Sequence, residues 1–236
     1  MSEFVGRLKA NESIQNLLVI TVDDGWTGFA RFAAPALAER GWPTTLYLTT
    51  YYAVHGRPVL NVLRSYLKWK GLLLPTPNKD DKSNFEDLMA TALLHDIDLR
   101  CEDGQLFGLS SPGELAALCR QGLDLQLHTH RHRVPSNNAD LADEIDTNRA
   151  IIERISGRSA PHLCYPSGEY RADQFEVLTD RGVQSATTTR LGLVSQHSNP
   201  MELPRLLDGE NLSDIEFDAE LSGFSSLVRQ FLGKNA

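Results

Sequence analysis

Two adjacent aspartates follow a run of apolar residues near the start of the sequence. Asp23 and Asp24 come directly after LLVITV (17–22), which has the composition of a buried strand, and they precede Gly25. Two carboxylates at a buried strand end are costly unless each has a cation, a hydrogen bond or a proton. Neighbouring strand residues point in opposite directions, so one carboxylate could ligate a metal while the other takes a proton. An ordinary Asp-Gly turn is the alternative interpretation.

Three histidines lie within five residues, directly after the apolar run LDLQL (123–127). His128 and His132 are four residues apart, and a helical turn would place them on one face while His130 points elsewhere. Zinc takes two imidazoles in this arrangement, whereas a solvated loop is the alternative. Two histidines and Asp24 leave a coordination position open, as catalytic zinc sites do. We therefore expect Asp24, His128 and His132 to bind a divalent metal ion, zinc in the first place.

Two further motifs give weaker signals. The segment CYPSGEY (164–170) contains Pro-x-Gly after a predicted strand, and such a turn exposes backbone N–H groups that can stabilise an oxyanion. An ordinary turn is the alternative there. In LPRL (203–206), Arg205 at a strand end could pair with a buried carboxylate, although a surface arginine is the default interpretation.

The elements that must position these residues alternate between strand and helix. Apolar runs predict strands at 17–22, 44–48, 123–127, 162–165, 183–187 and 202–206. Helical spacing and capping residues predict helices at 28–40, 59–70, 85–98, 112–122, 138–155, 174–181 and 212–232, with 51–58 as a loop. This alternation predicts an α/β fold, and a (β/α) barrel of six or seven strands fits it better than an open sheet, with its chemistry at the C-terminal strand ends. We interpret the stretch from about 50 to 110 as a helical insertion on the rim, in the position of a lid, of a single domain covering 1–236.

Composition excludes several classes of protein. The net charge of −8 disfavours a nucleic-acid partner. No apolar run is long enough to cross a membrane or to serve as a secretory leader, so a cytoplasmic location is expected. Three widely spaced cysteines, Cys101, Cys119 and Cys164, do not form a disulfide framework, which favours a reducing compartment. The oligomeric state stays open.

Taken in order, the motifs resemble those of the polysaccharide deacetylase family (carbohydrate esterase family 4). TVDDG (21–25) resembles the family motif T-F-D-D-G, and HTHRH (128–132) matches H-[ST]-x-x-H. CYPSG (164–168) resembles R-x-P-x-G in its Y-P-x-G form. The resemblance covers most of 17–207, outside the 50–110 insertion.

The resemblance implies a distorted (β/α) barrel of about seven strands and removal of an N-acetyl group from an amino sugar in a glycan or a glycan precursor. It implies that Asp23 is the general base toward a metal-bound water, and that Asp24, His128 and His132 are the metal ligands. It also implies that the backbone N–H of Ser167 helps to stabilise the oxyanion. The rest of the same motif, Tyr165, Pro166 and Gly168, is expected to border the substrate.

The sequence departs from the family at two points. Cys164 replaces the motif arginine that orients the base, and we hypothesise that Arg205 supplies this charge. The late L-x-H motif, which carries the general acid, is not recognisable, and His197 is the histidine of that region that could act instead. Two other functions stay open: an amide hydrolase acting on a cyclic imide or ureide, and a non-catalytic barrel that binds ligands.

Overall fold

The computed structural model describes residues 1–72, 81–100, 105–208 and 212–231. Cys101 and the proline-containing stretch 75–80 lie outside these residues. The described strands are β1 (Ile20–Asp24), β2 (Thr44–Leu48), β3 (Asp124–Leu127), β4 (His162–Cys164), β5 (Ser185–Leu191) and β6 (Leu203–Arg205). The described α-helices are α1 (Ser2–Lys9), α2 (Ala34–Glu39), α3 (Thr50–His55), α4 (Leu60–Trp69), α5 (Asp81–Leu94), α6 (Pro112–Arg120), α7 (Asn138–Ser156), α8 (Phe175–Asp180), α9 (Asp214–Leu221) and α10 (Phe224–Phe231).

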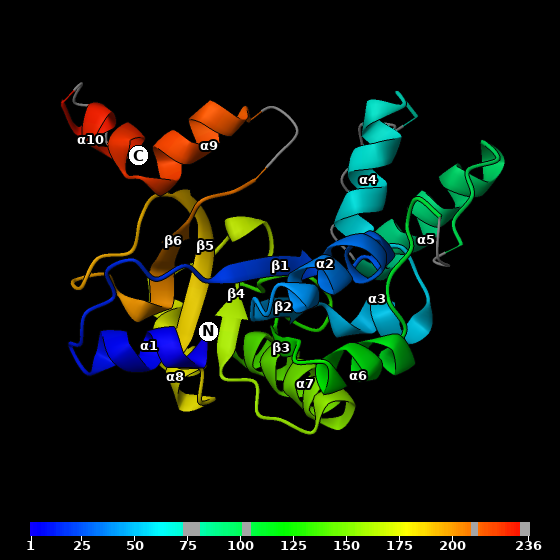
Figure 1. Cartoon of the computed structure of the whole chain (residues 1–236). Coiled ribbons are helices and arrows are strands. Elements are labelled where there is room, and N and C mark those ends of the chain that lie inside the picture. Colours follow the sequence, from blue (N-terminus) through cyan, green and yellow to red (C-terminus); the bar gives the residue numbers. More distant parts are fainter. Residues whose placement is uncertain (73–80, 101–104, 209–211, 232–236) are drawn as a thin grey trace. The chain divides into compact units, whose positions relative to one another are not determined.

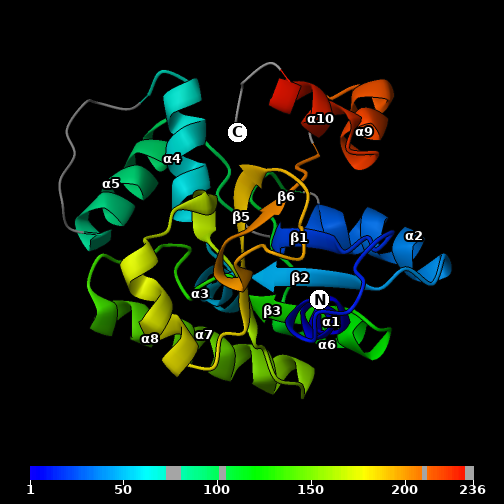
Figure 2. The same ribbon diagram turned by 90° about the vertical axis from the view of Figure 1, so that its left-hand side faces the viewer.

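The chain divides into two compact units. Unit 1 comprises Met1–Val19, Val134–Asp143 and Pro161–Ala236, and unit 2 comprises Ile20–Arg133 and Glu144–Ala160. Unit 2 contains β1, β2 and β3, which run parallel to one another (Figures 1 and 2). Unit 1 contains β4, β5 and β6, which are also parallel to their neighbours. Each predicted strand is therefore present, and parallel pairing agrees with the predicted α/β class.

Strand β2 shows why the strands of unit 2 could be predicted. Every residue of its sequence TTLYL is buried, as expected for a central strand of a parallel sheet. Its register pairs Asp23 with Tyr47 and Asp24 with Leu48 on one side, and Leu48 with Leu127 on the other. The C-terminal ends of β1 and β3 therefore lie on either side of the end of β2, which brings Asp24 and the segment after Leu127 to one edge.

The helices follow most of the predicted pattern, but α1 was not predicted, and the predicted helix 212–232 is divided into α9 and α10. The capping box of Ser111 and Glu114 is present at the start of α6, as predicted. The predicted helix 28–40 begins instead with a π-helical stretch, Phe29–Ala33, before α2. Pro35 stands in the first turn of α2, where its missing N–H is tolerated. The segment 51–58 was expected to be a loop, but it contains most of α3.

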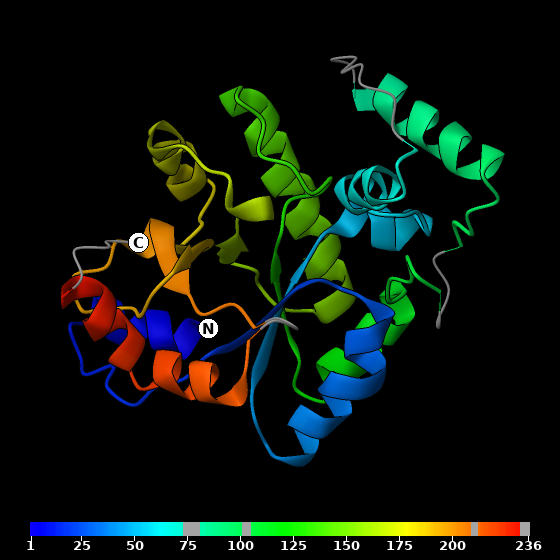
Figure 3. The same cartoon turned by 90° about the horizontal axis from the view of Figure 1, so that it is seen from above.

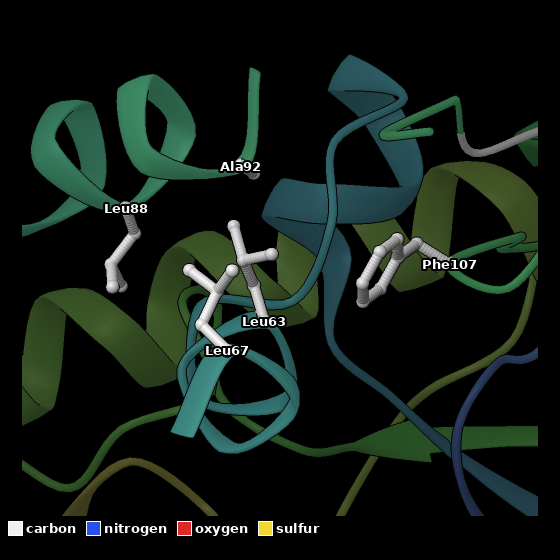
Figure 4. Close-up of a cluster of buried hydrophobic side chains, with 5 residues drawn as sticks. All are labelled: Leu63, Leu67, Leu88, Ala92 and Phe107. Carbon is white, nitrogen blue, oxygen red and sulfur yellow. The ribbon is translucent and has the colours of Figure 1, made fainter. Parts of the chain in front are cut away.

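The segment from 50 to 110 has a small hydrophobic core of its own. Leu63 and Leu67 on α4 point toward Leu88 and Ala92 on α5 and toward Phe107 (Figure 4). Helices α4 and α5 lie side by side (Figure 3). Burial of these side chains holds the two helices together. This part of unit 2 therefore lacks the regular alternation of strand and helix found in the rest of the unit.

Candidate metal centre

The TVDDG motif ends β1 in an unusual backbone conformation. Asp24 has a φ of +71°, and Gly25 has a φ of +104°. A β-carbon on Gly25 would lie 2.7 Å from Cδ1 of Leu48, so both the backbone and the space there require glycine. A left-handed aspartate is costly and is tolerated where the surroundings enforce it, which is common at functional sites. This turn directs the carboxylate of Asp24 toward the end of β3.

The HTHRH motif does not form the helical turn that the spacing suggested. Residues 128–132 have no helical assignment, and Thr129 and His132 both have positive φ, +58° and +53°. The predicted proximity of His128 and His132 is nevertheless present, with their ring centroids 4.9 Å apart. Two residues with left-handed backbone therefore bring the histidine rings together. The prediction that they lie on one helical turn was wrong.

Asp24, His128 and His132 converge on one point. Oδ1 of Asp24 lies 3.5 Å from Nε2 of His128 and 3.2 Å from Nε2 of His132. In a tetrahedral zinc site with bonds of about 2.0–2.1 Å, neighbouring ligand atoms are about 3.3 Å apart. The buried Oδ1 has no hydrogen-bond partner within the described residues. The spacing and this unsatisfied oxygen fit a bound divalent cation.

The protonation states also suit metal binding. Burial raises the pKa of Asp24, but the neighbouring imidazoles of His128 and His132 and the indole of Trp26 outweigh it and lower the pKa overall. Burial and the adjacent His128 lower the pKa of His132 to about 4, against the opposing effects of Asp24 and Asp23. At neutral pH, Asp24 is therefore ionised and His132 is neutral, which are the forms that bind a metal.

Helix α7 holds the start of the histidine segment through Asn148. Its Oδ1 accepts a hydrogen bond from the backbone N–H of His128 at 3.0 Å. Its Nδ2 donates to the carbonyl of Leu48 and to Oγ1 of Thr50, each at 3.0 Å. Asn148 is buried, so these bonds fix the end of β2 relative to the first histidine ligand.

One turn earlier on α7, Glu144 holds the other end of the segment. Its buried carboxylate accepts hydrogen bonds from the backbone N–H of Arg131 at 2.7 Å and from Nη1 of Arg131 at 3.0 Å. Nε of Arg133 donates a third hydrogen bond at 2.9 Å. Glu144 therefore binds the residues on both sides of His132.

His130 points elsewhere, as predicted. Its Nδ1 lies 2.9 Å from Oγ1 of Thr50, and its ring meets Tyr51 edge-on with centroids 5.5 Å apart. The backbone N–H of Tyr51 donates to the carbonyl of His130 at 2.8 Å. His130 therefore anchors the segment on α3 and lies outside the group of metal-ligating atoms.

The CYPSG motif lies in unit 1, where it forms a short helical turn at Pro166–Gly168. Ser167 is exposed and has a φ of +57°. Gly168 has a φ of +71°, and a β-carbon there would overlap the side chain of Thr189. Pro166 is buried, and so is Tyr165, whose hydroxyl donates to the carbonyl of Met201 at 2.9 Å. The turn is therefore rigid, and its exposed part is the peptide at Ser167.

Arg205 and His197 also belong to unit 1. Nε of Arg205 donates to the carbonyl of Thr188 at 2.9 Å, which fixes its side chain along β5. His197 is exposed, and its backbone N–H donates to Oγ of Ser195. Pairing of Arg205 with Asp23 and acid catalysis by His197 stay predictions.

Three supporting residues were not predicted from the sequence: Trp26, Glu144 and Asn148. The two on α7 carried a readable signal, because they lie on the same face as the buried Ile145 and Ile152. Polar residues within an apolar helical stripe need buried partners. Trp26 gave no signal beyond its position two residues after Asp24, because nothing in the spacing shows which way an indole points.

The sequence profile described as polysaccharide deacetylase matches residues 10–186, a range that contains Asp23, Asp24, both histidine ligands and the CYPSG motif. Arg205 and His197 lie beyond it. No curated protein sequence matches the chain.

Solved structures show the same fold at low sequence identity. The deacetylase PplD of Streptococcus pyogenes, solved with acetate, has a TM-score of 0.65 at 16% identity, over 93% of this chain and 76% of its own. A de-N-acetylase from Aggregatibacter actinomycetemcomitans gives 0.62 at 12% identity, over 92% and 80%. IcaB from Ammonifex degensii gives 0.61 at 15% identity, over 95% and 84%.

These structures confirm the predicted α/β barrel fold, with six strands among the described residues. The profile match covers most of the chain and includes the motifs that carry the site. The chain belongs to the polysaccharide deacetylase family, whose members are hydrolases that remove N-acetyl groups from sugars and are in general metal-dependent.

Proposed function

We propose that Asp24, His128 and His132 bind one divalent metal ion, zinc in the first place, and that Asp23 is the general base for hydrolysis of an N-acetyl group. The substrate would be an amino sugar in a glycan or a glycan precursor. The observation that supports this most strongly is the convergence of Oδ1 of Asp24 and two Nε2 atoms at 3.2 and 3.5 Å. Two nitrogens and one oxygen are a donor set that zinc prefers.

A bound divalent ion would polarise the acetyl carbonyl and make water acidic enough to act as a nucleophile near neutral pH. The chain's own residues have separate tasks. His132 presents a neutral imidazole, His128 offers a second ring nitrogen, and Asp24 supplies the negative charge. Asp23 precedes Asp24 on β1, and one of its carboxylate oxygens lies within 4.8 Å of a ring nitrogen of His128, which supports its proposed role as the base.

We further propose that the remaining motif residues complete the reaction. The backbone N–H of Ser167 would stabilise the oxyanion, and the absence of another hydrogen-bond partner for it among the described residues supports this role. Tyr165, Pro166 and Gly168 would shape the turn beside the substrate. Arg205 would orient Asp23, and His197 would protonate the leaving amine.

We also propose that residues 1–236 form one catalytic domain, because the family profile runs through parts of both units. No helix among the described residues is long and apolar enough to span a membrane. A cytoplasmic location stays a prediction, which cell fractionation would test.

Acetate release is the experiment that tests this function. Purified protein with added zinc would be incubated with N-acetylated amino sugars and their oligomers, beside an Asp24→Ala, His128→Ala double variant. We expect acetate release by the wild-type protein and none by the variant. Ring opening of a cyclic imide or ureide in place of acetate release would move the assignment to the other amide hydrolase. Sugar binding without any hydrolysis by the metal-loaded protein would favour the binding module.

A further inference from the structure

The two oxygens of the Asp24 carboxylate have different partners. Nε1 of Trp26 donates a hydrogen bond to Oδ2 at 3.1 Å. Oδ1 is buried, lacks a hydrogen-bond partner in the described part of the chain, and faces the imidazoles of His128 and His132. A carboxylate can bind a metal through either oxygen or through both, so a donor fixed on one of them limits the choice.

We propose that Trp26 is a positioning residue, which occupies Oδ2 of Asp24 and leaves Oδ1 as the single oxygen available to the metal. This inference rests on the proposed function, because it assigns a role at the same metal centre. The indole does not touch the metal in this assignment. It acts through the orientation of the carboxylate.

Trp26 is itself held in place by the backbone of the segment 108–110. Trp26 and Leu109 form an isolated antiparallel bridge. The N–H of Thr27 donates to the carbonyl of Gly108 at 3.0 Å, and the N–H of Ser110 donates to the carbonyl of Gly25 at 2.9 Å. The residues on both sides of Trp26 are therefore tied to this segment.

The ring of Trp26 packs against a buried cluster of Tyr52, Val59 and Leu109. All three residues belong to the stretch from 50 to 110, which was interpreted from the sequence as a rim insertion. Since the same stretch also fixes the backbone around Trp26, it supports the carboxylate ligand through the indole. In this assignment the stretch from 50 to 110 holds Asp24 in place and does not act as a lid.

The physical effect of losing this hydrogen bond follows from the carboxylate's freedom. Without the indole N–H, Asp24 can rotate about its terminal torsion and expose Oδ2 to the cation or to water. Loss of a group that orients a metal ligand typically weakens metal binding by about 10–100-fold. The ring should keep its packing role if only the N–H is removed.

The test uses Trp26→Phe, which keeps an aromatic ring and removes the N–H. Trp42→Phe and Trp69→Phe are matched controls, because both side chains are largely exposed, at 54% and 75%. Zinc affinity would be measured by competition with a chromophoric chelator, and coordination by the visible spectrum of the cobalt-substituted protein. We expect Trp26→Phe to bind zinc at least about tenfold more weakly, with an altered cobalt spectrum, while both controls match the wild type.

A second measurement does not depend on the folding of Trp26→Phe. The chain has three tryptophans, so the indole ¹H–¹⁵N signals of Trp42 and Trp69 can be assigned from the control variants. The remaining signal belongs to Trp26, and we expect zinc to shift it and to leave the other two unchanged.

Two outcomes would overturn the inference, and they are distinguishable. A wild type that binds no metal removes the proposed function and this inference with it. A wild type that binds zinc, with unchanged affinity and cobalt spectrum in Trp26→Phe or with an unmoved Trp26 indole signal, overturns the role of Trp26 alone.

Discussion

At the scale of single residues, adjacent carboxylates are assigned different tasks. Asp24 faces two imidazoles through one oxygen and an indole through the other. Asp23 lies one residue earlier on β1, paired in register with Tyr47. Replacing Asp24 should therefore lower the metal content, whereas replacing Asp23 should lower turnover alone.

We expect Asp23→Asn to keep its metal and to lose about 10²–10⁴-fold in turnover, because the amide cannot accept a proton from water. Asp24→Ala should lose the metal as well as the activity. Metal analysis and acetate release on both variants would check this. Loss of metal from Asp23→Asn, or undiminished turnover, would contradict the division of roles.

Gly25 gives a prediction about stability. Gly25→Ala places a methyl group 2.7 Å from Cδ1 of Leu48 at a φ of +104°, so we expect a loss of about 1–3 kcal/mol in the free energy of unfolding. Gly113→Ala is the control, since a β-carbon there meets nothing within 4 Å. Urea unfolding would measure the free energy of unfolding of both variants. Equal values for Gly25→Ala and Gly113→Ala would show that the turn is not constrained.

The candidate ligands could be predicted from residue type and order, but their backbone could not. His128 and His132 were paired by their spacing of four, which assumes a helical turn. The structure uses positive φ at Thr129 and His132, and for non-glycine residues no simple sequence rule predicts that conformation. The resemblance of motifs succeeded because order along the chain does not depend on local geometry.

At the scale of elements, α7 supports the histidine segment at two points. Glu144 and Asn148 lie one turn apart, and each binds backbone of the segment directly. Helical spacing and Gly157 predicted the boundaries of α7 within a residue. Its supporting role could be recognised only once the structure showed which of its faces is buried.

Glu144→Gln should destabilise the protein by about 1–3 kcal/mol, because the buried site loses the charge that pairs with two arginines. The loss stays small because both arginine side chains are about two-fifths exposed, at 41% and 38%, and water screens their charge. Glu153→Gln on the exposed side of α7 is the control. Thermal unfolding would compare them, and equal midpoints would contradict the supporting role.

Strand β4 carries a buried histidine that we expect to make stability depend on pH. His162 is fully buried, and its two ring nitrogens lie 2.9 Å from Oγ of Ser2 and 2.9 Å from Oγ of Ser185. Burial lowers the pKa of His162 to about 4, with smaller contributions from nearby positive charges that include Lys9. The unfolded chain therefore binds a proton near pH 6.5 that the folded chain binds only near pH 4.

This difference makes the folded state lose stability as pH falls from 6.5 to 4, by at most about 3 kcal/mol, with the full contribution present above pH 6.5. His162→Gln should reduce the slope of unfolding free energy against pH in that window. The exposed His95→Gln is the control. Urea unfolding at several pH values would show the slope, and an unchanged slope in His162→Gln would refute the assignment.

At the scale of the whole molecule, alternation of strands and helices was enough to predict the α/β class. The barrel was expected both from this alternation and from the family resemblance, which the profile over residues 10–186 and the solved structures bear out. The stretch from 50 to 110 breaks the alternation, so its helices could be placed by spacing while its contact with Trp26 could not. That contact depends on tertiary packing, which no local pattern encodes.

The most direct test of the account is anomalous diffraction at the zinc edge from crystals grown with zinc. We predict one strong peak about 2.0–2.2 Å from Oδ1 of Asp24 and from Nε2 of both His128 and His132. No peak at this position, or a zinc ion bound by other residues while this site stays empty, would contradict the proposed metal centre.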